Sequence, residues 1–226
     1  MEYLGHVVRP GEIAVDPNKV QAVQQWPVPK TIKEVRGFLG LTGYYRRFIP
    51  RYSRIALPLT ELLKNDTQMQ WGSEQQQAFE DLKKALTSAP VLVTPDTSPE
   101  ATFTLVTDAS GFGVGAVLLQ DKGEGLKPVS YFARKMNKHE RNYPVHEQEL
   151  LAVKEALLTF RCYLEGCAGI QVVTDHDTLR HFFRQKVLSR RQARWLQLFS
   201  QYQHQLQNTY RKGSQNQADS LSKRPD

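Results

Sequence analysis

The chain has 226 residues, 40% of them hydrophobic, which is enough material for one well-packed core and a smaller second one. It contains no apolar run approaching the roughly 18 residues of a membrane-spanning helix, and no secretory leader, so we expect neither a membrane partner nor secretion. Cys162 and Cys167 lack the second pair that a zinc site needs and are expected to be reduced, as in an intracellular protein.

The net charge of +7 is unevenly distributed along the chain. Residues 30–54 contain seven basic side chains and one acidic, Glu34, while residues 180–212 contain eight Lys or Arg and no Asp or Glu. Basic stretches of this density are typical of surfaces that bind a polyanion such as nucleic acid. Solvated helix faces without a ligand are the alternative interpretation.

The first ninety residues are expected to be mainly helical after an initial strand. Residues 3–8 alternate weakly and predict a strand, which the turn sequence at 9–11 ends. Thr31 can cap a helix by accepting from the amide of Glu34, whose side chain reaches back in a capping box. Ser73 begins a second signal of the same kind. The segment 12–90 is therefore predicted to consist mainly of helices, which begin near Asp16, Thr31 and Ser73.

A Pro-, Thr- and Ser-rich linker at 90–99 separates this segment from a differently patterned one, in which the hydrophobic period changes from about 3.6 to 2. Strands are predicted at 102–108, 113–120, 128–134, 170–174 and 205–210. Helices are predicted at 144–164, 178–184, 190–202 and 216–222. The order β-β-β-α-β-α-α-β-α predicts an α/β fold, a mixed five-stranded sheet with flanking helices.

Four acidic residues occupy positions at which packing alone does not explain a carboxylate. Asp108 and Asp175 stand at the ends of hydrophobic strands, where acidic residues are depleted. Glu149 lies on the long helix and Asp219 on the last one. A salt bridge or a helix cap is the alternative explanation for each of them taken singly.

Glu149 is the most informative of the four because it falls on an apolar stripe. At 100° per residue it is in line with Val153 and Phe160, whereas Glu147 and Glu155 project away from that stripe. A glutamate that faces a core is costly unless a cation or a hydrogen-bond donor meets it. We therefore expect Glu149 to have such a partner.

If the strands that carry Asp108 and Asp175 are neighbours, all four carboxylates can meet at one end of the sheet. A cluster of hard oxygen ligands repels itself without divalent cations, and magnesium is its natural occupant. Two such ions, roughly 3.5–4 Å apart, activate a water and stabilise the leaving oxygen in phosphodiester cleavage. The pattern predicts a two-metal nuclease whose catalytic residues and metal ligands are Asp108, Glu149, Asp175 and Asp219.

Several short motifs, taken together, are specific to one family. They are Tyr3-Leu-Gly-His6, Arg36-Gly-Phe-Leu-Gly-Leu-Thr-Gly-Tyr-Tyr-Arg-Arg-Phe48, Thr107-Asp-Ala-Ser110, Glu149-Leu-Leu-Ala152, Thr174-Asp-His176, Leu188-Ser-Arg-Arg-Gln-Ala-Arg-Trp195 and Ala218-Asp-Ser-Leu-Ser222. On these residues the chain resembles the Pol polyprotein of Gypsy-type LTR retrotransposons, over the end of reverse transcriptase and the RNase H domain.

The resemblance implies that residues 1–95 are the end of the reverse transcriptase palm and its mainly helical thumb, and that residues 96–226 are an RNase H-like domain. It places the family's four metal-binding acids on the residues already selected by spacing. The implied activity is that of an endoribonuclease H, which cuts the RNA strand of an RNA–DNA hybrid with two Mg²⁺ ions that Mn²⁺ can replace. The implied partners are the hybrid, the primer–template duplex and the remainder of the Pol polyprotein, in a cytoplasmic virus-like particle.

The two basic segments are expected to contact phosphates with little sequence preference. The side chains expected to do so are Arg36, Arg46, Arg47, Arg190, Arg191 and Arg194.

The sequence departs from the family pattern in two places. The Tyr-x-Asp-Asp motif of the polymerase is absent, so we expect no DNA synthesis by this chain alone. Residues 205–218 lack the histidine that cellular ribonucleases H place before the last aspartate, and Tyr210 is the nearest candidate for its place. A non-catalytic, nucleic-acid-binding remnant of a reverse transcriptase is the alternative hypothesis, whereas a generic basic scaffold would not explain Glu149.

Overall fold

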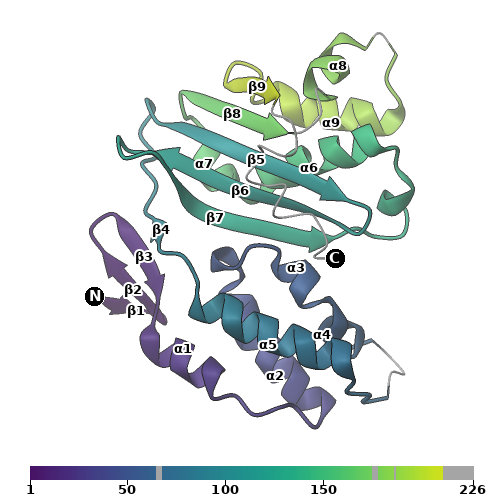
Figure 1. Ribbon diagram of the computed structural model, residues 1–226. Coiled ribbons are helices and arrows are strands. Elements are labelled where there is room, and N and C mark those ends of the chain that lie inside the picture. The colour runs from purple at the N-terminus through teal and green to yellow at the C-terminus, as the bar shows by residue number, and fades with distance from the viewer. Residues whose placement is uncertain (65–67, 175–177, 186, 211–226) are drawn as a thin grey trace. The chain divides into compact units, whose positions relative to one another are not determined.

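A computed structural model describes residues 1–64, 68–174, 178–185 and 187–210 (Figure 1). The chain divides into two compact units. The N-terminal unit comprises Met1–Thr94 and Ser130–Arg134, and the C-terminal unit comprises Pro95–Val129 and Lys135–Asp226. Within the described residues, no helix has the length and apolar character needed to cross a membrane.

The N-terminal unit begins with a small sheet of strand order β1-β2-β3-β4. Its strands are β1 (Glu2–Tyr3), β2 (His6–Arg9), β3 (Glu12–Val15) and β4 (Leu92–Val93), each antiparallel to the next. The strand expected at 3–8 is thus divided by a turn. The sequence does not predict β3, because four residues are too few to establish a period of two, and one of its neighbours, β4, comes from the other end of the unit.

The turn between β1 and β2 requires glycine at position 5. Gly5 has a φ of +75°, in the left-handed region, and a Cβ added to it would lie 2.5 Å from the Oη atom of Tyr45. The same Oη donates a hydrogen bond to the Gly5 carbonyl at 2.9 Å, and Tyr44 Oη donates to the Leu4 carbonyl at 2.8 Å. Two adjacent tyrosines therefore hold the backbone of this turn.

Helices complete the N-terminal unit (Figure 1). They are α1 (Pro17–Gln24), α2 (Ile32–Tyr44), the 3₁₀ turn η1 (Arg46–Phe48), α3 (Tyr52–Ile55), α4 (Leu57–Glu61) and α5 (Ser73–Thr87). Asp16 caps α1 by accepting from the Asn18 amide at 2.8 Å. The Thr31 cap of α2 is confirmed, since Thr31 Oγ1 accepts from the Glu34 amide, whereas Glu34 Oε2 accepts from the amide of Lys30, one residue before the cap.

The cap expected at Ser73 is wrong by one residue. The N-cap of α5 is Gly72, and Ser73 is already in the first turn of the helix. The Gln75 side chain reaches back and accepts from the Gly72 amide at 3.1 Å, so the first turn receives a side-chain partner without a capping hydroxyl. The sequence signal contained both a serine and a glutamine, and the glutamine makes this bond.

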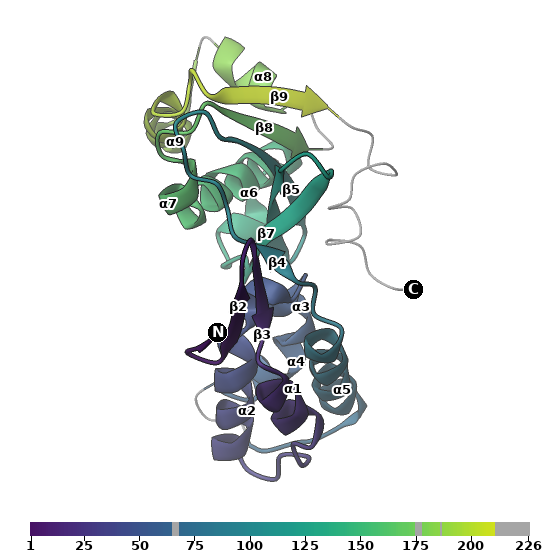
Figure 2. The same cartoon turned by 90° about the vertical axis from the view of Figure 1, so that its left-hand side faces the viewer.

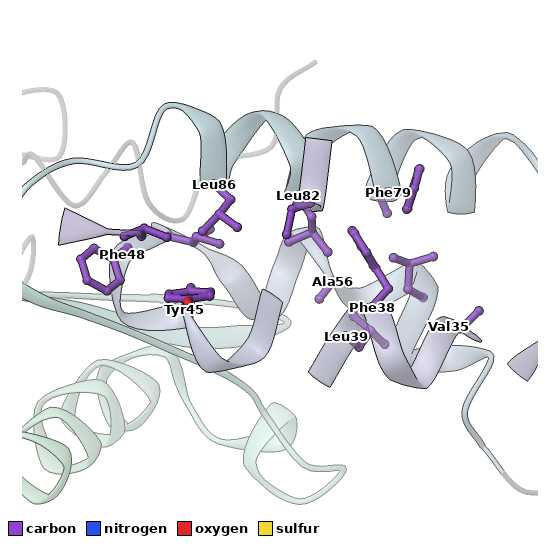
Figure 3. Packing of buried hydrophobic residues seen from close by; sticks show 14 of the residues in the cluster. Val35, Phe38, Leu39, Tyr45, Phe48, Ala56, Phe79, Leu82 and Leu86 are labelled. Carbon is purple, nitrogen blue, oxygen red and sulfur yellow. The ribbon is translucent and has the colours of Figure 1, made fainter. Parts of the chain in front are cut away.

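An apolar, aromatic core fills the N-terminal unit (Figure 3). Phe38 of α2 and Phe79 of α5 have ring centroids 4.6 Å apart, and Trp26 meets Phe38 edge-on at 5.9 Å. Tyr45 and Phe48 are fully buried beside them in the same cluster. The core thus joins α2, η1 and α5 and supports the tyrosine that holds the β1–β2 turn.

The second sheet is mixed, with strand order β7-β6-β5-β8-β9, and it belongs to the C-terminal unit except for Ser130–Arg134 of β7, which is grouped with the N-terminal unit. Its strands are β5 (Thr102–Ser110), β6 (Gly113–Asp121), β7 (Leu126–Lys135), β8 (Gly169–Thr174) and β9 (Leu206–Tyr210). β5 and β6 are antiparallel, whereas β8 lies parallel to both β5 and β9. The predicted α/β architecture with a mixed five-stranded sheet is therefore confirmed.

Helices flank this sheet (Figure 2). They are the 3₁₀ turn η2 (Glu140–Asn142), α6 (Val145–Thr159), α7 (Arg161–Leu164), α8 (Thr178–Arg184) and α9 (Arg190–Ser200). α6 contacts β5 and β6, and both α8 and α9 contact α6. The single helix predicted at 144–164 is interrupted at the buried Phe160, and the helix predicted at 216–222 lies outside the described residues.

Candidate active site

Asp108 lies inside the central strand of the sheet and is 5% exposed. Its backbone pairs with Gly115 of β6. β5 continues to Ser110, so the expectation that Asp108 ends its strand is wrong on the β6 side, where the hairpin extends the pairing. On the other side, the parallel pairing with β8 is described from Thr102 to Val106 and does not include Asp108.

Glu149 is buried on α6, with 3% of its surface exposed, as its place on the apolar stripe predicts. α6 packs on β5, the strand that carries Asp108. Both residues interact with other groups of the protein. Two acidic side chains from contacting elements are therefore withdrawn from water, at a desolvation cost that a cation can offset.

Glu147 is buried although the helical wheel places it away from the apolar stripe. It is 5% exposed, and its Oε2 accepts a hydrogen bond from Nη2 of Arg191 on α9. The apolar stripe was too narrow a description of α6, because Leu151 and Ala152 are buried as well. Glu147 precedes Leu150 by three residues and Leu151 by four, and this spacing is the signal that could have shown its burial.

Two of the four predicted ligands, Asp175 and Asp219, lie outside the described residues. Asp175 directly follows Thr174, the last residue of β8, and β8 is the parallel neighbour of β5. The prediction that all four carboxylates can meet required the strands of Asp108 and Asp175 to be neighbours, and β5 and β8 are neighbours. The backbone of Tyr210 pairs with Thr174, so β9 ends beside the end of β8.

The carboxylates of Asp108 and Glu149 suit a divalent ion, but within the described residues they do not make up a complete set of metal ligands. Asp108 and Glu149 supply carboxylate oxygens, the ligands that Mg²⁺ and Mn²⁺ prefer. Among the described residues, no group of three His, Cys, Asp or Glu side chains is assembled that could hold a metal. A complete site would need the carboxylates of the segments that follow β8 and β9.

The six predicted phosphate-binding arginines fall into two classes. The exposed ones are Arg36, Arg46, Arg190 and Arg194. Arg47 and Arg191 are half-buried, with guanidinium carbons 5.2 Å from the Phe48 ring centroid and 3.7 Å from that of Tyr143. Only the first class presents an unobstructed charge to solvent.

Residues 98–202 match the family described as the RNase H-like domain found in reverse transcriptase. The C-terminal unit thus contains a domain of a nuclease family whose members generally use divalent metals.

Curated relatives match almost the whole chain. It is 43% identical over 223 residues to the retrovirus-related Pol polyprotein from transposon 297 of Drosophila melanogaster, covering 98% of this chain and 20% of the relative. It is 38% identical over 228 residues to the transposon Tf2-3 polyprotein of Schizosaccharomyces pombe, covering 99% of this chain and 17% of the relative. The chain spans about a fifth of the length of these relatives. These matches support the expectation that the chain is a fragment of a retrotransposon Pol polyprotein, and the Gypsy type is consistent with these relatives.

Solved structures support the fold. A foamy viral protease-reverse transcriptase in complex with an RNA/DNA hybrid matches with a TM-score of 0.76 and 23% identity, over 100% of this chain and 30% of that one. Another in complex with double-stranded DNA matches with a TM-score of 0.74 and 22% identity, over 98% and 38%. The RNase H-like fold expected from the sequence is thereby confirmed.

Proposed function

We propose that the chain is an endoribonuclease that hydrolyses the RNA strand of an RNA–DNA hybrid. The observation that carries this proposal is the burial of Asp108 and Glu149 on β5 and α6, two elements in contact, within an RNase H-like fold. Packing does not require a carboxylate at either position, whereas metal-dependent phosphodiester cleavage does.

The proposed site consists of Asp108, Glu149, Asp175 and Asp219. When bound, two Mg²⁺ ions, or Mn²⁺ in their place, supply Lewis acidity and a lowered pKa of a coordinated water. Asp108 is fixed by the β5–β6 ladder and Glu149 by the packing of α6 on β5, so both carboxylates are held before substrate arrives. Asp175 and Asp219 are assigned from the sequence, since each follows an element that ends beside this region.

Substrate binding is assigned to the exposed arginines. We assign phosphate contacts to Arg190 and Arg194 because both are exposed on α9, and such contacts give affinity without sequence preference. Recognition of a hybrid then depends on its shape and on 2′-hydroxyls. The foamy viral relative that was solved with an RNA/DNA hybrid supports this class of partner.

The N-terminal unit is assigned to the end of a reverse transcriptase palm and its thumb, through which the parent polyprotein would hold the primer–template duplex. Matches to Pol polyproteins over almost the whole of this chain support this assignment. Arg36 and Arg46 are its exposed candidates for backbone contacts.

The test is a cleavage assay on the full chain. A fluorescent RNA–DNA hybrid should be cut with Mg²⁺ or Mn²⁺, EDTA should stop the reaction, and double-stranded DNA of the same sequence should stay intact. Asp108→Asn, which preserves volume and removes the charge, should abolish cleavage while hybrid binding persists. Equal inactivity of wild type and Asp108→Asn, with binding retained in both, would establish the non-catalytic remnant instead.

A further inference from the structure

One ion pair of the C-terminal unit joins α9 to α6 close to Glu149. Arg191 Nη2 of α9 donates to Oε2 of Glu147 on α6, two residues before Glu149. The guanidinium carbon of Arg191 lies 3.7 Å from the centroid of the Tyr143 ring and 5.9 Å from that of Trp195. Arg191 thus has a carboxylate partner and two aromatic neighbours.

The surroundings make this ion pair stronger than a surface pair. The Glu147 side chain is 7% exposed, and that of Arg191 is 38% exposed. Low exposure reduces screening by water, and stacking on an aromatic ring restricts a planar guanidinium. Loss of either partner would leave the other without its counter-charge, and for Glu147 this would be a buried charge.

The pair also connects two helices with different proposed tasks. α9 carries Arg190 and Arg194, the exposed arginines assigned to phosphates, and α6 carries Glu149. Glu147 and Glu149 are half a turn apart at the N-terminal end of α6, so a rotation or shift of this end moves both. Ser189 caps α9 by accepting from the Gln192 amide at 3.2 Å, which fixes the turn from which Arg191 extends.

We propose that Glu147 and Arg191 are positioning residues, whose ion pair holds the first turns of α6 so that the Glu149 carboxylate keeps its place relative to Asp108. This inference rests on the proposed nuclease function. It also separates Arg191 from Arg190 and Arg194, because its guanidinium is occupied by Glu147 and Tyr143. Misplaced ligands weaken metal binding and slow the reaction, and loss of groups that orient metal ligands typically costs about 10–100-fold in either property.

The experiment compares Glu147→Gln, Arg191→Met, the double variant and the conservative Arg191→Lys with wild type, all as full chains. Two readouts are used: kcat and KM for hybrid cleavage, and Mn²⁺ binding without substrate, measured by electron paramagnetic resonance of free Mn²⁺. Leu164→Ala removes a fully buried side chain of α7 and leaves a cavity in the core, so it controls for reduced stability. Arg194→Ala controls for the loss of a phosphate ligand.

The expected result is a fall in kcat and in Mn²⁺ affinity of at least about tenfold for each single charge-removing variant, with KM within about twofold. The double variant should be no worse than the worse single variant, because the two residues act as one unit. Arg191→Lys should recover most of both properties. Arg194→Ala should raise KM and leave Mn²⁺ binding unchanged.

Two results with the variants would overturn the proposal, and so would one result with wild type. Losses no greater than those of an equally destabilised Leu164→Ala would assign the pair to stability alone. A raised KM with normal kcat and Mn²⁺ binding would make Arg191 a phosphate ligand. If wild type binds Mn²⁺ without cutting the hybrid, the proposed nuclease function is wrong, but Mn²⁺ binding by the variants still tests the positioning role of the Glu147–Arg191 pair. If wild type binds no Mn²⁺, the nuclease function and the positioning role are both wrong.

Discussion

The two units bury acidic side chains for different reasons. In the described part of the N-terminal unit the one buried carboxylate is Asp16, which caps α1 by a bond within its own turn. The C-terminal unit buries Asp108, Glu140, Glu147 and Glu149.

Local structure accounts for some of these acids. Glu140 accepts from the amide of Asn137 at 2.9 Å, and Glu147 has Arg191. Asp108 and Glu149 lie on a sheet strand and in a helix, where no cap is required. A helix cap or the Arg191 ion pair therefore explains some of these buried acids, whereas a helix cap does not explain Asp108 or Glu149.

The largest expected effect tests this distinction directly. Glu149→Gln should reduce hybrid cleavage on the order of 10³-fold, because a metal ligand is lost, while thermal stability stays equal or rises as a buried charge is removed. Asp16→Ala should do the reverse: cleavage unchanged and stability lowered by about 1 kcal/mol through loss of a cap. Cleavage rates and denaturant unfolding measure the two variants side by side. Activity retained in Glu149→Gln would contradict the assignment of a metal ligand.

A smaller effect is expected from the exposed arginines of each unit. Changing Arg190 and Arg194 together to Ala should lower the slope of log affinity against log salt by about 0.9 for each phosphate that is no longer neutralised. The matched pair is Arg36 and Arg46 in the N-terminal unit, whose removal should affect binding of a long primer–template more than that of a short hybrid. Fluorescence anisotropy between low and moderate salt measures both. An unchanged salt slope in the Arg190 and Arg194 double variant would show that α9 does not contact the nucleic acid.

The smallest expected effect is on the free energy of unfolding, and it distinguishes the helix caps that the sequence predicts at Thr31 and Ser73. Thr31→Ala should cost about 1 kcal/mol, since its hydroxyl accepts from the Glu34 amide. Ser73→Ala should cost nothing or stabilise slightly, because Ser73 is inside α5 and alanine is the better helix former. Urea unfolding of the two variants is sufficient. An equal loss in both would restore Ser73 as the cap.

Most of the fold could be predicted from the sequence because its signals are local. The five strands of the second sheet lie within about two residues of their predicted bounds, and the most apolar of them, β6 and β8, are clear hydrophobic runs. β3 could not be predicted, since it depends on pairing with β4 from the far end of the unit. The Gly72 cap was not predicted because glycine has no side chain to cap with, and the serine beside it gives the stronger sequence signal.

The candidate site was predictable where periodicity determines it. The helical spacing of Glu149 indicated its burial, and the structure confirms it. The spacing of Glu147 to Leu150 and Leu151 could have shown its burial, but its partner Arg191 lies more than forty residues later, where no local pattern predicts it. Asp175 and Asp219 remain predictions from the sequence.

The β1–β2 turn has a consequence for how the chain can vary over evolution. Gly5 and Tyr45 occupy each other's space, because a methyl group at position 5 would lie within 2.5 Å of the phenol oxygen. The two positions are therefore epistatic: alanine at position 5 becomes tolerable only in a background where position 45 has lost its hydroxyl, and even then the left-handed backbone costs roughly 1 kcal/mol. Covariation between these two positions, forty residues apart, should accordingly be visible in an alignment of relatives.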